Sequence, residues 1–122
     1  METFPKPSQE LDVLLTDAIT GIDCIKKKMF GAPVYWVNGN MFAGVHGSGI
    51  FLRLTEADRR KFMDKYDEAS LFEPVPGHTM KEYVLVPAAV YDHPETFSVW
   101  LDKAFTSTAA LPPKSPKLRS KK

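Results

Sequence analysis

Hydrophobic and polar residues follow two different periods along this chain, one typical of helices and one typical of strands. Near the N-terminus, SQELDVLLTDAITGI (residues 8–22) repeats apolar residues every three or four positions, which predicts a helix. Ser8 can cap this helix, and Gly21 weakens its end, so we expect it to stop near Ile22. The predicted apolar stripe is Leu11, Leu14, Leu15, Ala18, Ile19 and Ile22.

The next segment is typical of strands separated by tight turns. The predicted strands are CIKKKMF (24–30), VYWV (34–37), NMFAGVH (40–46) and IFLRL (50–54). Asn38-Gly39 lies between two of them, and this pair favours the positive φ angles of a type I′ hairpin turn. Gly47-Ser48-Gly49 is followed by IFL, without the further glycine or the Gly-Lys-Ser/Thr step of phosphate-binding loops. The glycines therefore indicate hairpin turns in a meander.

The second half of the chain predicts two more helices and one more strand. Thr55 can cap a helix that buries Phe62, Met63 and Tyr66. Residues 71–79 are interrupted by prolines and are expected to form a connection, and MKEYVLVP (80–87) reads as a fifth strand. Asp92 is expected to cap the last helix, which carries the clearest helical stripe. This stripe consists of Phe97, Trp100, Leu101, Ala104 and Phe105.

The order of these elements predicts the fold class. Consecutive strands joined by tight turns pair antiparallel, so the chain is expected to form a two-layer α+β domain with about five strands and three helices, in the order α-β-β-β-β-α-β-α. At 122 residues with 43% hydrophobic content, the chain suits one domain with one core. We expect an N-terminal extension at 1–9, the domain at 10–111 and a tail at 112–122.

Charge is distributed unevenly between the domain and the tail. The tail, PPKSPKLRSKK, holds five of the sixteen basic residues and no acid, which leaves eleven basic against fifteen acidic residues in the rest of the chain. With three prolines and one aliphatic residue the tail is expected to be disordered, and any nucleic-acid binding is expected to be weak and non-specific. The candidate nucleic-acid contacts are Lys26, Lys27, Lys28, Lys114, Lys117, Arg119, Lys121 and Lys122.

The residues that could carry chemistry are few and scattered, so we predict no catalytic residue, no metal site and no cofactor. His46, His78 and His93 lie 32 and 15 residues apart, which matches no metal-ligand spacing. Cys24 could act as a nucleophile only with a base beside it and a lowered pKa, and a lone cysteine at a strand edge is more often a small hydrophobe. A single cysteine allows no intramolecular disulfide, which fits a reduced, cytoplasmic setting. No stretch approaches the ~20 apolar residues needed to cross a bilayer, and the N-terminus does not read as a signal peptide.

Alternation along the strands predicts a second sheet face that carries aromatic rings. One set of positions holds Val34, Trp36, Met41, Ala43, Val45, Ile50, Leu52 and Leu54, and the other holds Tyr35, Val37, Phe42, His46, Phe51 and Arg53. If helices cover only one face, Tyr35, Phe42, Phe51 and Arg53 form a candidate interaction face. Such a face could be a homodimer interface, a ligand face or a base-stacking platform. Alternatively, a helix or loop covers it.

Several short motifs together resemble the N-terminal domain of the TfoX/Sxy competence regulators. They are KKMFG (27–31), Gly39, MFA (41–43), LRL (52–54), and Phe72, Met80, Tyr83 and Pro87 within LFEPVPGHTMKEYVLVP. The similarity spans about residues 10–106 and includes the last helix, while Ala32 stands where the family often has a second glycine. The resemblance implies a small α+β domain with an antiparallel sheet and without established enzymatic chemistry. Two-domain members act in bacterial competence gene regulation, alongside other transcription factors.

These observations favour a stand-alone TfoX N-terminal-like domain that is not an enzyme and acts through protein contacts, in regulation of competence or transcription. One alternative is an accessory protein that binds nucleic acid through its basic tail. A second alternative is a small-molecule-binding or enzymatic role whose residues the sequence does not identify. The partner protein is unknown at this stage, and a homodimer and a non-membrane location are expected.

Overall fold

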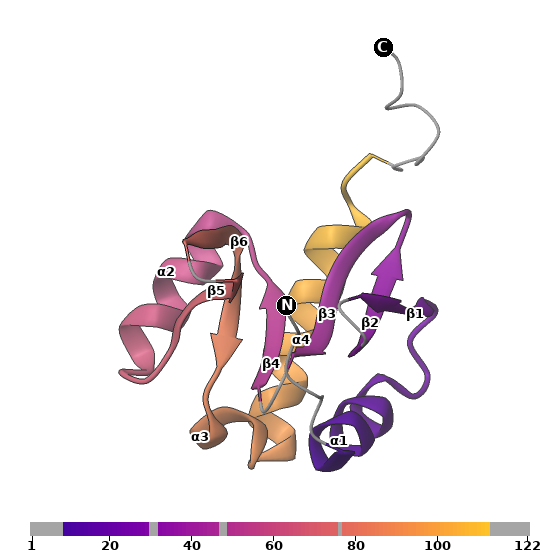
Figure 1. Cartoon of the computed structure of the whole chain (residues 1–122). Helices are drawn as coiled ribbons and strands as arrows, with labels where there is room; N and C mark the ends of the chain where they lie inside the picture. Colours follow the sequence, from indigo (N-terminus) through magenta and orange to yellow (C-terminus); the bar gives the residue numbers. More distant parts are fainter. Residues whose placement is uncertain (1–8, 30–31, 47–48, 76, 113–122) are drawn as a thin grey trace, which may run out of the picture.

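The computed structural model describes residues 9–29, 32–46, 49–75 and 77–112. Within them, six strands form one antiparallel sheet in the order β1-β2-β3-β4-β6-β5, accompanied by four helices (Figure 1). The strands are β1 (Ile25–Met29), β2 (Ala32–Val37), β3 (Asn40–His46), β4 (Gly49–Arg53), β5 (Ser70–Val75) and β6 (His78–Val86). The helices are α1 (Gln9–Ile19), α2 (Glu56–Lys65), α3 (Ala88–Tyr91) and α4 (Pro94–Ala109). The predicted two-layer α+β class is confirmed.

The first four strands form the predicted meander. Each of β1, β2 and β3 pairs antiparallel with the strand that follows it, and Asn38 and Gly39 have φ angles of 53° and 76° at the β2–β3 turn. Both positive angles are those of the type I′ turn expected from Asn-Gly. The chain then leaves the sheet through α2 and returns so that β6 pairs with β4 and β5 lies outside β6.

One face of the sheet packs against helices. α4 lies against β2, β3 and β4, and α1 contacts β3 and β4 (Figure 1). Trp100 of α4 contacts Phe62 of α2 edge-to-face, with ring centroids 5.0 Å apart, so the two helices share one core. The buried strand residues of this core are Tyr35, Phe42, Ala43, Val45, Ile50, Leu52, Val84 and Val86.

The opposite face holds a second, smaller core that β5 closes. Phe72 of β5 stacks on Phe51 of β4, with ring centroids 4.3 Å apart and planes inclined by 16°. The pairing of β5 with β6 shifts register twice, once on either side of Phe72. Such bulges allow an edge strand to bend across the face of the sheet, in keeping with this contact. The buried residues of this second core are Val34, Met41, Phe51, Phe72 and Tyr83.

Three sequence-based expectations about elements were wrong. Residues 70–75, expected to lie mostly in a connection, form β5, because an edge strand tolerates a proline such as Pro74 that has no N–H to donate. The short helix α3 was not anticipated, and Asp92 ends α3 instead of capping the last helix. The N-cap of α4 is His93, with Pro94 at the first helical position. Thr55 does cap α2, since its hydroxyl accepts from the Asp58 amide at 3.2 Å.

Candidate functional site

The predicted aromatic interaction face does not exist as an open surface. Tyr35 and Phe42 are buried in the core beneath the helices, whereas Phe51 is buried in the second core on the opposite face. The prediction failed because simple alternation breaks at a β-bulge: Tyr35 pairs with Ala43 and Trp36 with Met41, which leaves Phe42 as the extra residue. The ring of Phe42 packs edge-to-face on Phe105 of α4 at 5.3 Å. Helices therefore cover Tyr35 and Phe42, as the alternative expected, whereas Phe51 is covered by the strand β5, which was not expected.

The three candidate lysines of β1 do not form one basic patch. Lys26 lies 3.7 Å from Asp12 of α1 and 5.7 Å from the centre of the Tyr35 ring. Because side chains alternate along a strand, Lys27 points to the opposite face from Lys26 and Lys28. The other five nucleic-acid candidates (Lys114, Lys117, Arg119, Lys121, Lys122) lie outside the described residues, so nucleic-acid binding stays a prediction.

Cys24 and the histidines lack the surroundings of a catalytic or metal site. Burial and the nearby Asp23 carboxylate raise the pKa of the Cys24 thiol, which is the opposite of what a nucleophile requires. Among the described residues, no group of three or more histidine, cysteine, aspartate or glutamate side chains could hold a metal ion. His46 instead contacts Phe72 edge-to-face at 5.4 Å.

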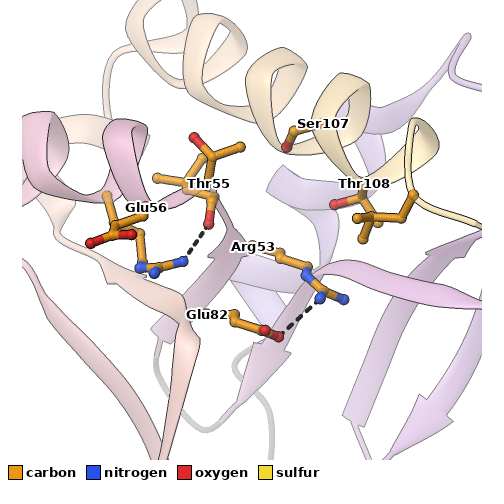
Figure 2. Close-up of a pocket in the computed structure, with 9 residues that line it drawn as sticks. Arg53, Thr55, Glu56, Glu82, Ser107 and Thr108 are labelled. Atoms are coloured by element: carbon orange, nitrogen blue, oxygen red, sulfur yellow. Dashed lines mark hydrogen bonds and ion pairs between the residues drawn. The ribbon is translucent and has the colours of Figure 1, made fainter.

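The structure brings polar side chains together in a cavity that the sequence did not indicate. Its volume is about 240 Å³, and it lies where the start of α2 and the end of α4 meet β4 and β6 (Figure 2). Arg53, the fourth member of the predicted face, lines this cavity with most of its side chain buried. The other lining residues are Leu54, Thr55, Glu56, Arg59, Glu82, Ser107, Thr108 and Leu111.

Hydrogen bonds hold the charged walls of this cavity in place. Arg53 donates to Glu82 at 2.9 Å, and its guanidinium lies 5.6 Å from the centre of the Tyr83 ring. Arg59 donates through Nη1 to the Leu54 carbonyl at 2.6 Å, which orients its guanidinium at the start of α2. We name this region the Arg59 cavity.

Two residues of this cavity, Arg59 and Thr108, were not singled out by the sequence pattern, for different reasons. The helical pattern after Thr55 does not single out Arg59, because only the Leu54 carbonyl, which accepts a hydrogen bond from the Arg59 guanidinium, shows where that group lies. Thr108 carried a signal, because it follows Leu101 by seven residues and Ala104 by four and so continues the buried stripe of α4. A threonine on a buried apolar stripe is notable because its hydroxyl needs a hydrogen-bond partner.

A second depression runs between α1 and the α3–α4 corner. Its volume is about 420 Å³, and its apolar lining consists of Leu14, Ala18, Tyr91, Pro94 and Phe97, with Ser98 beside them. Asp17 from α1 and Asp92 from the end of α3 also line it, and both are exposed. We name this depression the α1–α4 groove; it combines an apolar floor with negative charge.

The TfoX N-terminal domain family model matches residues 19–108, which cover the sheet, α2, α3 and most of α4. This chain belongs to the TfoX N-terminal domain family. No curated protein and no solved structure matches the chain. No helix in the described ranges is long and apolar enough to cross a membrane.

The TfoX motif residues that the structure describes act in turns and packing. Gly39 forms the β2–β3 turn, and Phe42 fills the core under α4. The Tyr83 hydroxyl of β6 donates to the Met41 carbonyl of β3 at 3.0 Å, passing over β4 within the second core. Phe30 and Gly31, which belong to the same motif, lie outside the described residues. The motif therefore specifies this fold, whereas the Arg59 cavity and the α1–α4 groove are built largely from residues outside it.

Proposed function

We propose that this chain is a regulatory domain that binds another protein, in the control of competence or transcription, and that performs no catalysis. The observation that carries the proposal is the TfoX N-terminal domain match over residues 19–108. The raised pKa of the Cys24 thiol also favours a role without nucleophilic chemistry.

The α1–α4 groove is the surface that best suits a protein partner. Protein-binding surfaces commonly combine an apolar centre with a polar rim, and here Leu14, Tyr91 and Phe97 are flanked by Asp17 and Asp92. Residues 1–111 hold fifteen acidic against eleven basic residues, so the charge of this part of the chain favours a basic partner. The occupant that we propose is an amphipathic segment of another protein, with apolar residues in the groove and lysine or arginine side chains at the two aspartates.

Charge reversal in the groove tests this proposal. The full chain is used as bait in a nuclease-treated lysate of the encoding organism, alongside Asp17→Lys/Asp92→Lys and a control, Asp64→Lys/Asp67→Lys, that reverses exposed charges near the end of α2. We expect the wild type and the control to retain a common protein that the groove variant loses. Titration of that purified protein is then expected to show about tenfold or weaker binding to the groove variant.

Two results would contradict the proposal. Equal capture by the groove variant would exclude the groove as the contact surface. Capture that disappears with nuclease treatment would favour the accessory protein that binds nucleic acid, since the retained proteins would then be held through DNA or RNA.

A further inference from the structure

Two arginines and two glutamates line the Arg59 cavity, so the lining charges sum to zero, but Arg59 is the one of the four that forms no ion pair within the described ranges. Glu82 pairs with Arg53 at 2.9 Å, and Glu56 pairs with Arg60 at 3.2 Å. Arg59 has no carboxylate partner within the described ranges, and its one hydrogen bond there from the side chain is to the Leu54 carbonyl. Four of its five N–H donors therefore remain for another acceptor. The cavity thus presents one positive charge without a paired carboxylate.

Thr108 adds an independent sign of a missing ligand. Its side chain lines the same cavity and is 1% exposed, and its hydroxyl has no hydrogen-bond partner among the described residues. A threonine inside a helix usually bonds the carbonyl four residues earlier, but here Ser107 approaches the Ala104 carbonyl at 3.4 Å. Figure 2 shows the Thr108 hydroxyl turned toward the space between Arg53 and Ser107. A buried hydroxyl in this state is costly unless something binds it.

The start of α2 contributes to the same environment. Thr55 satisfies the amide of Asp58 with its hydroxyl and the amide of Arg59 with its carbonyl, at 3.2 Å and 2.8 Å. The amides of the first helical turn and the helix dipole still favour a negative group beside the helix start. The positive charge of Arg59, the donor at Thr108 and the dipole of α2 therefore all favour an oxyanion.

We propose that the Arg59 cavity binds a carboxylate, with its oxygens on the Arg59 guanidinium and a second acceptor group of the same ligand on the Thr108 hydroxyl. A guanidinium and a carboxylate are both planar and can form two parallel hydrogen bonds in a bidentate pair. A monoanion matches the one arginine without an ion-pair partner, and Glu56 and Glu82 repel a dianionic phosphate about twice as strongly as a monoanion. The volume of about 240 Å³ accommodates the carboxylate with a short carbon chain. Its source is a small carboxylic acid or an acidic side chain of a bound protein.

Titration of the full chain with acetate and succinate, followed by amide and arginine Nε–Hε NMR signals, tests the site. We expect saturable shifts at Arg59, at the start of α2 and at Thr108, and none of comparable size with chloride at equal ionic strength. Arg59→Gln is expected to weaken binding by about tenfold or more. The control Lys61→Gln removes an exposed charge from the same helix and is expected to bind as the wild type does.

Thr108→Val separates ligand binding from a purely structural role. This substitution removes the unpartnered hydroxyl and keeps the shape of the side chain, so the ligand-free variant is expected to melt at a temperature equal to or above that of the wild type. Its affinity for succinate is nevertheless expected to fall several-fold, because the donor is gone. Unchanged affinity in this variant would exclude Thr108 as a ligand.

Other outcomes identify the source or overturn the site. Tighter binding of an N-acetylated, C-amidated aspartate peptide than of succinate assigns the carboxylate to a partner protein, and the reverse assigns it to a small acid. Three results would overturn the proposal. They are NMR shifts that do not saturate, shifts in Arg59→Gln as large as those in the wild type, and binding of phosphate or chloride as tight as that of succinate. None of these results depends on the α1–α4 groove, so the two proposals succeed or fail separately.

Discussion

Gly44 lies on β3 where the second core leaves no room for a side chain. A methyl group added there would lie 2.5 Å from Cζ of Phe51 and 2.6 Å from Cγ1 of Val34. Phe51 cannot move away easily because its ring stacks on Phe72. We therefore expect Gly44→Ala to lower the free energy of unfolding by about 1–3 kcal/mol, measured by urea denaturation.

Gly49 is the matched control for this prediction. A methyl group there would meet Cδ1 of Leu85 at 2.9 Å, but this atom is the far end of a flexible side chain. Gly49→Ala is expected to cost less than half as much as Gly44→Ala. Equal effects would mean that added volume anywhere along β3 and β4 is equally harmful, and that the Phe51–Phe72 stack is not rigid.

Ionisation of Tyr83 is expected to make the stability of the folded state depend on pH. Burial raises the pKa of its hydroxyl above the usual value of about 10, because the ionised form is poorly solvated in the second core. The folded state thus favours the neutral phenol; this contribution is complete below pH 10 and is lost as pH rises through the higher pKa of the folded state. Stability measured from pH 8 to 11 is expected to fall less steeply in Tyr83→Phe than in the wild type, although the variant loses the bond to Met41. Parallel curves would show that Tyr83 does not ionise in this range.

At the scale of elements, an aromatic cluster joins α4 to α2. Trp100 is 7% exposed and contacts the rings of Phe62 and Tyr66. Trp100→Ala is expected to cost about 3–5 kcal/mol in thermal or urea unfolding, because the cavity left behind cannot close fully. Val99, one residue earlier and 54% exposed, provides the control, and Val99→Ala is expected to change stability by less than about 0.5 kcal/mol. A small effect at Trp100 would mean that α4 is not docked as the structure shows.

Phe72 is a large residue that anchors β5 in the second core. Phe72 is buried between Phe51 and His46, whereas its neighbour Leu71 is more than one-third exposed. Phe72→Ala is expected to cost about 3–5 kcal/mol and to speed amide hydrogen exchange in β5 and β6, and Leu71→Ala is expected to do neither. Unchanged exchange in β5 of the Phe72 variant would show that backbone pairing alone holds this strand.

Local signals in the sequence predicted the elements that depend on local chemistry. Asn38-Gly39 specified its turn, Thr55 specified the start of α2, and the stripe through Trp100 specified α4. The predictions failed where contacts between residues distant in the sequence determine the structure. Alternation could not show that a bulge turns Phe42 to the helix side of the sheet. Pro74 favoured a connection over a strand at 70–75, and the contact between Phe72 and Phe51, 21 residues earlier, has no local signal. The Arg59 cavity forms only where the start of α2 lies beside the end of α4, and no local sequence pattern predicts that these two segments meet.

At the scale of the whole molecule, the edges of the sheet bear on self-association. The sequence suggested a homodimer through an open aromatic face, but Tyr35 and Phe51 are core residues on opposite faces. The remaining route is pairing at an edge strand, and both edges carry features that oppose it. β1 presents Lys26, Lys27 and Lys28, and β5 contains Pro74 and two irregularities in pairing. Lysines, prolines and bulges are common means of preventing edge-to-edge association.

We therefore expect the wild-type chain to sediment as a monomer at micromolar concentration. Lys27→Val/Lys28→Val gives β1 a β-branched, uncharged edge, and we expect this variant to self-associate with rising concentration. The control Lys61→Val/Lys65→Val makes the same exchange on the exposed side of α2 and is expected to stay monomeric, since a helix offers no unpaired strand edge. A wild-type dimer that persists at low micromolar concentration would contradict the prediction. Association of the helix control to the same extent would show that added surface hydrophobicity, and not the strand edge, drives assembly, because β1 is a sheet edge with backbone groups that can pair with a second copy and α2 is not.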